Sequence, residues 1–161
     1  MSAADEPAIA AVGEDDLDDL LPLMRAYCDF YEVAPSDEDL LALSRALIAD
    51  PAREGLQLLA RDESGRAIGF ATIFWTWSTT RAARVGVMND LFVAPGGRGS
   101  GAADALIAAC LERCRSHGAA LLAWQTAPDN HRAQAVYERV GARRSQWLDY
   151  DLPVQQEEKA Q

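Results

Sequence analysis

The feature that most constrains this 161-residue chain is a glycine-rich turn between an apolar run and a helical pattern. The run, residues 85–93, is rich in β-branched and aromatic side chains and predicts a buried strand. After the turn, residues 95–103, apolar side chains recur at helical spacing as far as His117. Glycines allow an anion to approach the unpaired N–H groups of the helix's first turn, and Arg98 adds a positive charge. The pattern therefore predicts a phosphate-binding turn.

Two common phosphate-binding loops fit this turn poorly. A Walker loop needs Gly-Lys followed by Ser or Thr, but the only lysine of the chain is Lys159. A dinucleotide-binding turn could use Gly97, Gly99 and Ala102, which have passable spacing. No clear βαβ unit with a ribose-binding acid follows, so the dinucleotide interpretation is disfavoured.

The turn resembles that of the GNAT superfamily of acyl-CoA N-acyltransferases. Residues 98–103 (RGSGAA) match the family's Arg/Gln-x-x-Gly-x-Gly/Ala signature, and residues 90–95 resemble the end of its fourth strand. Residues 130–142 (NHRAQAVYERVGA) are similar to the family's Asn-x-x-Ala-x-x-x-Tyr-x-x-x-Gly-Phe element, with Ala142 in place of Phe. The resemblance covers residues 85–142 by motif and the rest of the chain by element order.

The resemblance implies an α/β fold with a mixed, strongly twisted sheet of six to seven strands and about four flanking helices. The chain length suits a single domain over residues 1–161, and we expect the polar end, 153–161, to be frayed. The residue patterns predict strands at 8–12, 55–61, 67–78, 85–93, 120–126 and 145–152, and helices at 17–31, 36–48, 100–117 and 130–140. Pro22 is awkward within the first helix and predicts either a late start or a kink.

The resemblance also implies acetyl-CoA as the co-substrate. Its pyrophosphate would bind at the turn, and backbone groups at the end of the central strand would hold the pantetheine arm in a gap between splayed strands. One of the strand's N–H groups would also donate to the thioester oxygen. The expected binding residues are Leu91, Phe92, Val93, Arg98, Gly99, Ser100, Gly101, Ala102, Ala103, Asn130 and Tyr137.

Within the second motif, Tyr137 is the expected general acid. It lies two helical turns after Asn130 and therefore on the same helix face. A phenol with a pKa of about 10 stays protonated at neutral pH and can donate to a departing thiolate. The alternative is a tyrosine that only packs against the sheet. Asn130 has two compatible roles, as a helix cap and as a pantetheine contact.

A substrate ammonium must lose a proton before it attacks, and Asp90 on the central strand is the best candidate for the general base. It could instead bind the ammonium or pair with an arginine, and a water chain could replace a side-chain base. Tyr31 and Glu32 follow the first helix, in a segment that covers the acceptor site in the family. Trp75 is a further substrate candidate, although an aromatic residue in this strand is more often part of the core.

The net charge of −10 disfavours nucleic acid as a partner, and no apolar run is long enough to span a membrane. Acidic residues gather in the first forty positions, where they form either a solvated surface or a field that attracts a cationic amine. Three cysteines without metal or redox spacing, and an N-terminus without a signal pattern, predict a cytoplasmic protein with reduced thiols. With only two histidines, we expect no metal site.

The sequence therefore predicts an enzyme that transfers an acetyl group from acetyl-CoA to the primary amine of a small, cationic molecule by direct attack. Two alternatives stay open: acetylation of a protein or peptide amine, and a CoA-binding module without catalysis. Relatives often dimerise, so a homodimer is also considered.

Overall fold

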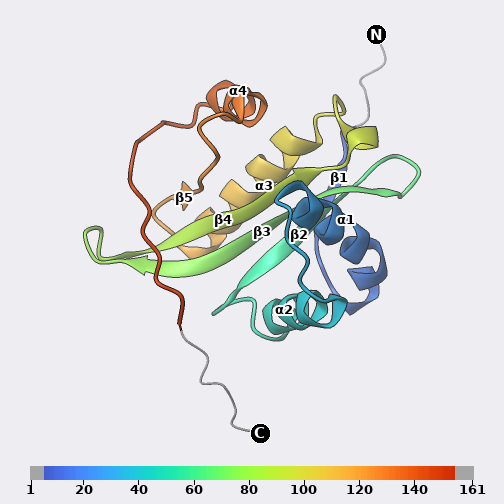
Figure 1. The fold of residues 1–161 in the computed structure, drawn as a ribbon, viewed down its shortest axis with the longest axis horizontal. Coiled ribbons are helices and arrows are strands. Elements are labelled where there is room, and N and C mark those ends of the chain that lie inside the picture. Colours follow the sequence, from blue (N-terminus) through green and yellow to red (C-terminus); the bar gives the residue numbers. More distant parts are fainter. Residues whose placement is uncertain (1–5, 155–161) are drawn as a thin grey trace, which may run out of the picture.

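The computed structural model describes residues 6–154 and shows one mixed sheet with helices on both faces (Figure 1). The sheet has five strands in the order β1-β2-β3-β4-β5. The strands are β1 (Ala8–Ala11), β2 (Gly55–Arg61), β3 (Ala67–Ser78), β4 (Ala83–Val93) and β5 (Leu122–Ala123). The helices are α1 (Leu17–Phe30), α2 (Asp37–Ala49), α3 (Ala102–His117) and α4 (His131–Arg139), with short 3₁₀ turns at Glu14–Asp16 and Pro95–Gly97.

The first four strands form antiparallel neighbours, and only β5 runs parallel to its neighbour β4. β3 and β4 pair over most of their length, so they form the long central ribbon of the sheet (Figure 1). β5 pairs with β4 only at Gly86–Leu122 and Val87–Ala123. The two central strands of the sheet are therefore long, and the strands at both edges, β1 and β5, are short.

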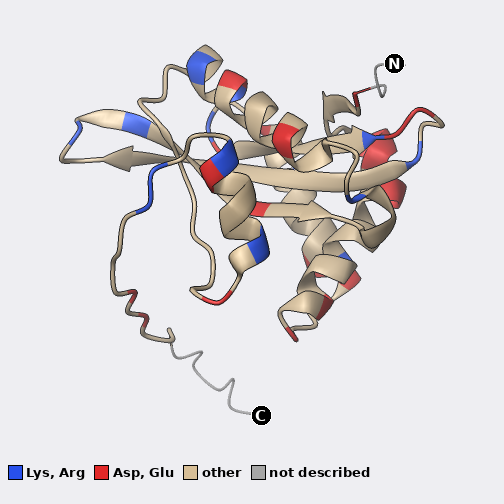
Figure 2. Cartoon of the chain, turned by 90° about the horizontal axis from the view of Figure 1, so that it is seen from above, with Lys and Arg blue, Asp and Glu red and all other residues tan. Residues whose placement is uncertain are grey.

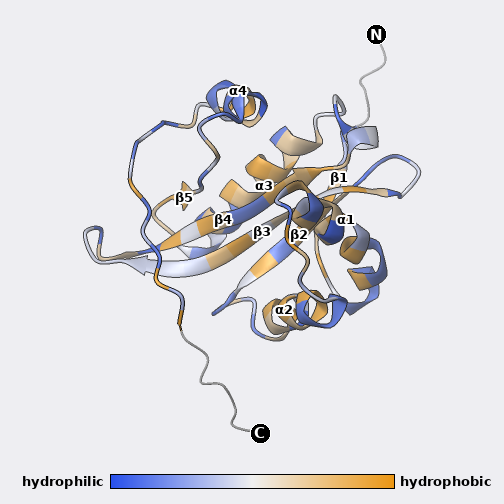
Figure 3. Ribbon diagram, in the orientation of Figure 1, coloured by the Kyte–Doolittle hydropathy of each residue, from blue (hydrophilic) through white to orange (hydrophobic). Residues whose placement is uncertain are grey.

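Each face of the sheet has its own hydrophobic core. On one face α3 buries Leu106, Cys110 and Cys114 against β2, β3 and β4. On the other face α1 buries Leu20 and Met24 against β2 and β3. Figure 3 shows this arrangement as hydrophobic colour along the central strands and the inner sides of the helices. Both cysteines act as small apolar core residues, as the spacing on α3 indicates.

The helix caps follow the sequence pattern closely. The Ser36 hydroxyl accepts the amide of Asp39 at 3.1 Å at the start of α2, and Gly118 ends α3 with φ +78°. The helix α1 continues through Pro22 and begins before it, at Leu17. Of the two expectations for Pro22, a helix start close to it is therefore wrong, and Pro22 lies inside the helix.

The strand predicted at residues 145–152 does not form, so the expectation of six to seven strands is wrong. In the described part of the chain no backbone ladder joins these residues to a neighbouring strand. The strand expected at 120–126 is also reduced to Leu122–Ala123. The predicted frayed end, 153–161, lies mostly outside the described residues.

Gly86 provides a test of how tightly α3 is seated on the sheet. A Cβ atom at Gly86 would lie 2.5 Å from the Cys114 sulfur and 3.0 Å from the Trp75 ring. We expect Gly86→Ala to lower the free energy of unfolding by about 1–3 kcal/mol, because the packed core cannot take the extra methyl without moving α3. Urea unfolding followed by circular dichroism measures this change.

Gly13→Ala is the matched control, since its added Cβ meets only the Asp16 carboxylate at an ordinary 3.9 Å. We expect this control to change the free energy of unfolding by no more than about 0.5 kcal/mol. Equal losses in the two variants would show that α3 is not closely packed at Gly86.

Candidate active site

A cleft of about 690 Å³ opens where β4 and β5 diverge, between the end of α1, the start of α3 and α4. It collects most of the predicted residues: Tyr31, Leu91, Phe92, Val93, Arg98, Gly99, Gly101, Ala102, Ala103, Asn130 and Tyr137 line it. These residues come from four separate segments of the chain, so the fold brings both sequence motifs to one place.

The N-terminus of α3 forms the anion-binding end of the cleft. The ladder of α3 opens with the bond from the Ala105 amide to the Gly101 carbonyl at 3.0 Å, so the amides before it lack helical partners. Gly99 and Gly101 have φ values of +80° and +81°, and no atom lies within 4 Å of a Cβ built on either. A side chain at these two positions would strain the backbone and occupy the space in front of the amides. The site therefore fits a phosphate group.

Arg98 lies beside these amides and is exposed. Within residues 6–154 no carboxylate forms an ion pair with it, whereas Arg139, which also lines the cleft, pairs with Asp104. A free guanidinium next to unpaired amides is a suitable partner for phosphate oxygens. The charge and the helix end thus favour the same class of ligand.

Beyond Val87, β4 has no strand on its β5 side, which leaves backbone groups open to the cleft. The Ala94 amide bonds to the Ile68 carbonyl of the other neighbour at 2.8 Å. Because antiparallel ladders alternate with a period of two, Phe92 also directs its backbone toward β3, and Leu91 and Val93 direct theirs into the cleft. Leu91 and Val93 are therefore the two residues that can pair with an extended ligand.

A β-bulge interrupts β4 at the centre of the cleft. Thr72 is opposite Asp90 and Ile73 is opposite Met88, so Asn89 is the extra residue. The side-chain amide of Asn89 donates to the Asp90 carboxylate at 3.0 Å. The backbone carbonyl of Asn89 accepts a hydrogen bond from the Tyr27 hydroxyl at 3.4 Å. The bulge turns Asn89 toward the cleft and Asp90 toward α1.

Asp90 lies behind the cleft lining in a largely apolar setting. Burial raises its carboxyl pKa, although hydrogen bonds from Thr72, Tyr27 and Asn89 oppose the shift. The nearby Tyr27 hydroxyl also has a raised pKa, because of burial and the Asp90 charge. Asp90, the predicted base, therefore lies next to the cleft lining without being part of it, and Tyr27 lies beside it.

Tyr137 lies on α4 and packs edge-on against Trp124, with ring centroids 5.2 Å apart. Burial raises the pKa of its phenol, and Tyr31 adds to the shift. Asn130 caps α4, since its side-chain oxygen accepts the Ala133 amide at 3.1 Å. The cap is confirmed, and it leaves the side-chain N–H₂ group of Asn130 available to the cleft.

Aromatic side chains of α1 form the opposite end of the cleft. Tyr27 and Tyr31 pack at 5.0 Å between ring centroids, and Phe30 stacks edge-on against Tyr31 at 5.1 Å. Phe30 and Tyr31 are exposed although they are large and apolar. An open aromatic surface beside a half-buried carboxylate is suited to an organic cation.

Four predicted residues do not line the cleft. Asp90 is set behind it, and the Ser100 hydroxyl faces inward to the Gly97 carbonyl. Glu32 is exposed at the end of α1 with φ +56°, outside the lining. Trp75 lies on the α3 face of the sheet.

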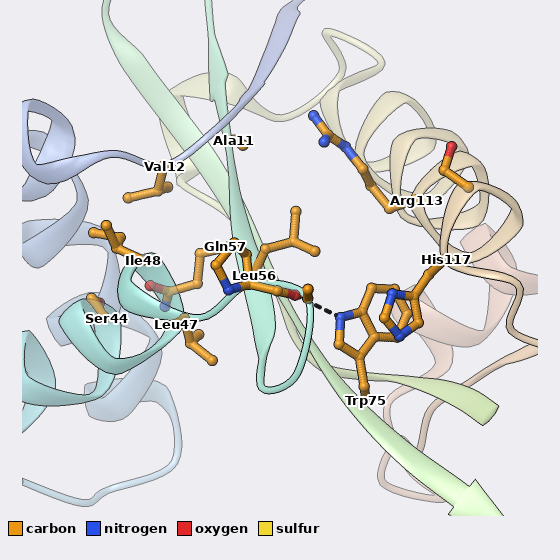
Figure 4. Close-up of a pocket in the computed structure, with 13 residues that line it drawn as sticks. Ala11, Val12, Ser44, Leu47, Ile48, Leu56, Gln57, Trp75, Arg113 and His117 are labelled. Carbon is orange, nitrogen blue, oxygen red and sulfur yellow. Dashed lines mark hydrogen bonds between the residues drawn. The ribbon is translucent and has the colours of Figure 1, made fainter.

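Trp75 borders a second, smaller hollow of about 350 Å³ between α2, the end of β1 and the end of α3 (Figure 4). Its ring is stacked on His117 at 3.9 Å, and its N–H donates to the Pro51 carbonyl at 2.9 Å. The tryptophan is 8% exposed and belongs to the core. The suggested role in substrate binding is therefore not supported, and the alternative of a core aromatic is the better description.

The lining residues that sequence reasoning missed include Tyr27, Asn89 and Trp124. Tyr27 is one helical turn before Tyr31, so the i, i+4 spacing could have indicated a shared face. The side-chain position of Asn89 depends on the bulge, for which the sequence carries no signal. Trp124 follows β5 and becomes accessible only because that strand stops at Ala123.

The sequence model of the acetyltransferase (GNAT) family matches residues 20–142. The chain belongs to this family. This GNAT protein is therefore an acetyl-CoA-dependent N-acetyltransferase, in agreement with its two motifs.

Individual relatives agree with this assignment. A Bacillus subtilis (strain 168) protein named "Uncharacterized N-acetyltransferase YhfO" is 33% identical over 122 residues, which covers 76% of this chain and 80% of that protein. The crystal structure of a probable acetyltransferase is 30% identical, with a TM-score of 0.80 over 93% of this chain and 99% of that chain. AAC(6')-Iy, in complex with the bisubstrate analog CoA-S-monomethyl-acetylneamine, has a TM-score of 0.79 over 93% and 99%, and at 22% identity it shows the shared fold alone.

In the described residues of this GNAT enzyme, no cluster of three or more His, Cys, Asp or Glu side chains could share a metal ion. Across the same residues, no helix combines the length and apolar character that membrane crossing requires.

The raised pKa of Asp90 predicts a pH-dependent stability effect. The folded state holds the Asp90 proton more tightly than the unfolded chain, so stability falls as pH rises from the unfolded pKa through the folded one. We expect Asp90→Asn to be more stable than the unsubstituted protein at pH 7, and this advantage to disappear near pH 4. Urea unfolding between pH 4 and pH 8 measures both.

Asp129→Asn is the control, because it removes an exposed carboxyl from a loop. We expect the free energy of unfolding of Asp129→Asn to equal that of the unsubstituted protein at every pH. If Asp90→Asn also gave the same free energy of unfolding as the unsubstituted protein at every pH, the Asp90 carboxyl would not be desolvated in the fold.

Proposed function

We propose that this protein acetylates the primary amine of a small, cationic molecule by direct attack on acetyl-CoA, with Tyr137 as the general acid. The observation that carries the proposal is a single cleft with two unlike ends. One end has unpaired amides and Arg98, and the other has exposed aromatic rings in front of Asp90. Tyr137 also lines the cleft.

The residues present fit CoA at the amide end. The amides of residues 99–103 and the Arg98 guanidinium would hold the pyrophosphate, because the two glycines keep the approach clear. Leu91 and Val93 would pair with the extended pantetheine arm along the open side of β4. Acetyl-CoA supplies an activated thioester, whose acetyl group moves to the amine while its thiol departs.

Tyr137 has the properties of a proton donor for that departing thiol. Its raised pKa keeps the phenol protonated over the whole neutral range, and Trp124 and the sheet hold the ring in place. The Asn130 cap fixes the first turn of α4 and thereby the direction in which Tyr137 projects. The cap and the packing would thus hold a neutral acid at the cleft.

Asp90 is placed to accept the proton that the attacking ammonium must lose. A raised pKa makes its carboxylate a stronger base than an exposed one. Tyr27 stands between Asp90 and the cleft, so its hydroxyl can pass the proton inward. In this arrangement Tyr27 and Asp90 would take the proton from the attacking ammonium, and Tyr137 would give a proton to the departing thiol.

A cationic acceptor agrees with the acidic residues that gather in the first forty positions. Several carboxylates of the first forty residues pair with arginines, as in Glu14–Arg45 and Asp16–Arg61. Figure 2 shows acidic residues on the helices of the α1 and α2 side. The remaining negative charge and the α1 aromatic rings favour an ammonium over a neutral amine. A protein of the same fold, AAC(6')-Iy, was solved with an analog that joins CoA and acetylneamine.

A thiol-release assay with acetyl-CoA tests the substrate class. The acceptors are polyamines, aminoglycosides, amino acids and peptides at matched concentration. We expect turnover with at least one polycationic small amine, and we expect its KM to rise with salt because screening weakens the attraction. Turnover on peptides alone would favour the protein-acetylating alternative. Binding of acetyl-CoA without turnover of any acceptor would favour a binding module.

Tyr137→Phe tests the general acid. We expect kcat to fall about 10²- to 10⁴-fold, because the thiolate then leaves without a proton donor, while the Kd of acetyl-CoA changes little. Steady-state kinetics and calorimetry measure the two quantities. Tyr150→Phe is the control, since Tyr150 is an exposed tyrosine outside the cleft. Unchanged turnover in Tyr137→Phe would remove the assignment.

A further inference from the structure

The smaller hollow, between α2, the end of β1 and the end of α3, contains a buried acceptor without a donor. Gln57 lines this hollow and is 3% exposed. Its side-chain oxygen has no hydrogen-bond partner among residues 6–154. Figure 4 shows the amide end of Gln57 directed toward Ser44 and Ile48, which line the same hollow. A buried acceptor that lacks a donor is unfavourable, so this oxygen indicates a ligand that supplies one.

The orientation of the Gln57 amide is set by its nitrogen. The nitrogen donates to the Thr72 hydroxyl at 3.2 Å and to the Met24 sulfur at 3.5 Å. Because the Thr72 hydroxyl gives its own proton to Asp90, it needs a donor from Gln57 and not a second acceptor. The amide nitrogen is therefore engaged in the core, and the oxygen is the atom left for a ligand.

The other side of the hollow carries one unpaired charge. Arg113 and His117 line it from the end of α3, on the opposite side of β2 from the amide (Figure 4). In the described chain Arg113 forms no ion pair, whereas Arg115 pairs with Glu112 at 3.2 Å. Burial, and then the charge of Arg84, hold the pKa of His117 below its ordinary value, so the imidazole is neutral at pH 7. Arg113 is therefore the charged group of the lining, and it favours an anion.

Apolar side chains connect these two polar ends. Leu47 and Ile48 of α2, Leu56 of β2 and Trp75 of β3 line the hollow between them. Its volume of about 350 Å³ lies at the lower end of the range for small-molecule sites, roughly 300–1,000 Å³. The described lining contains no carboxylate, so a buried ammonium would lack a counter-ion there. A neutral hydroxyl is therefore the better donor to the Gln57 oxygen.

We infer that this hollow binds a small hydroxylated carboxylic acid. The carboxylate would pair with Arg113, the apolar body would pack on the side chains between the two ends, and the hydroxyl would donate to the Gln57 side-chain oxygen. The hollow and the catalytic cleft share no lining residue. The inference therefore does not depend on the acceptor of the acetyl group or on the role of Tyr137.

Isothermal titration calorimetry of the full chain tests the inference. The probes are para-hydroxybenzoate, para-hydroxyphenylacetate and para-hydroxyphenylpropanoate, which separate the carboxylate from the hydroxyl by increasing lengths. We expect at least one of these acids to bind with one-to-one stoichiometry. The same molecule without its hydroxyl, or with a carboxamide in place of the carboxylate, should bind at least about 10-fold more weakly, because each change removes the partner of one polar end.

Variants of the two ends assign the binding to this hollow. Arg113→Gln should raise the Kd of the acid at least about 10-fold and leave that of the carboxamide unchanged, because it removes the charge that pairs with the carboxylate. Arg115→Gln is the matched control, since Arg115 is an exposed arginine of the same helix outside the lining, and it should not change either Kd. Gln57→Met should abolish the preference for the hydroxylated acid. Thermal melts verify that each variant is folded.

Saturating acetyl-CoA should leave the Kd of the acid unchanged, because the two sites have no residue in common. Displacement of the acid by acetyl-CoA would place it in the cleft and overturn the inference. The inference is also overturned if none of the three acids binds at concentrations on the order of 10 mM. Equal affinity with and without the hydroxyl, or equal Kd values in Arg113→Gln and Arg115→Gln, would have the same consequence.

Discussion

The active site depends on one discontinuity, the divergence of β4 from β5. The two strands share backbone bonds at only two residue pairs, after which β4 continues alone to Val93. A fully paired strand would have covered the amides of Leu91 and Val93 and closed the cleft. Because the pairing stops, a hydrogen-bonding edge is left inside the protein, in line with the glycine-lined end of α3. A thioester ligand needs both of these features together.

The second constraint is the polar chain that supports Asp90 from within the core. Gln57 donates to the Thr72 hydroxyl at 3.2 Å, and both side chains are buried. With that hydrogen bond accepted, the Thr72 hydroxyl is free to donate to Asp90, where it opposes the desolvation of the carboxylate. The bulge at Asn89 sets Asp90 over Thr72. A carboxylate can therefore be kept near an apolar core without an arginine partner, which is what a base requires.

The two edges of the sheet differ in how they are finished. At one edge β1 covers only part of β2, and the helix α2 and the end of α3 lean over the remainder around Trp75 and His117. At the other edge β5 is short and no helix covers it in the described chain. The β1 edge is therefore covered, whereas the β5 edge has no further strand paired with it in the described chain. The catalytic cleft lies beside this second edge.

The sequence by itself determined the family, the glycine-rich turn, the four helices and most of the residues that line the cleft at the N-terminus of α3. These features depend on local rules: glycine conformation around Gly99 and Gly101, the caps at Ser36 and Asn130, and the helical spacing of Asn130 and Tyr137. Only the tertiary structure decided where β5 stops, where β4 bulges, and that Trp75 is buried with His117 while Tyr27 faces the cleft. It also decided that residues 145–152 form no strand. Pairing and side-chain placement depend on partners distant in the chain, and an alternating pattern records a tendency to pair without recording whether a partner is within reach.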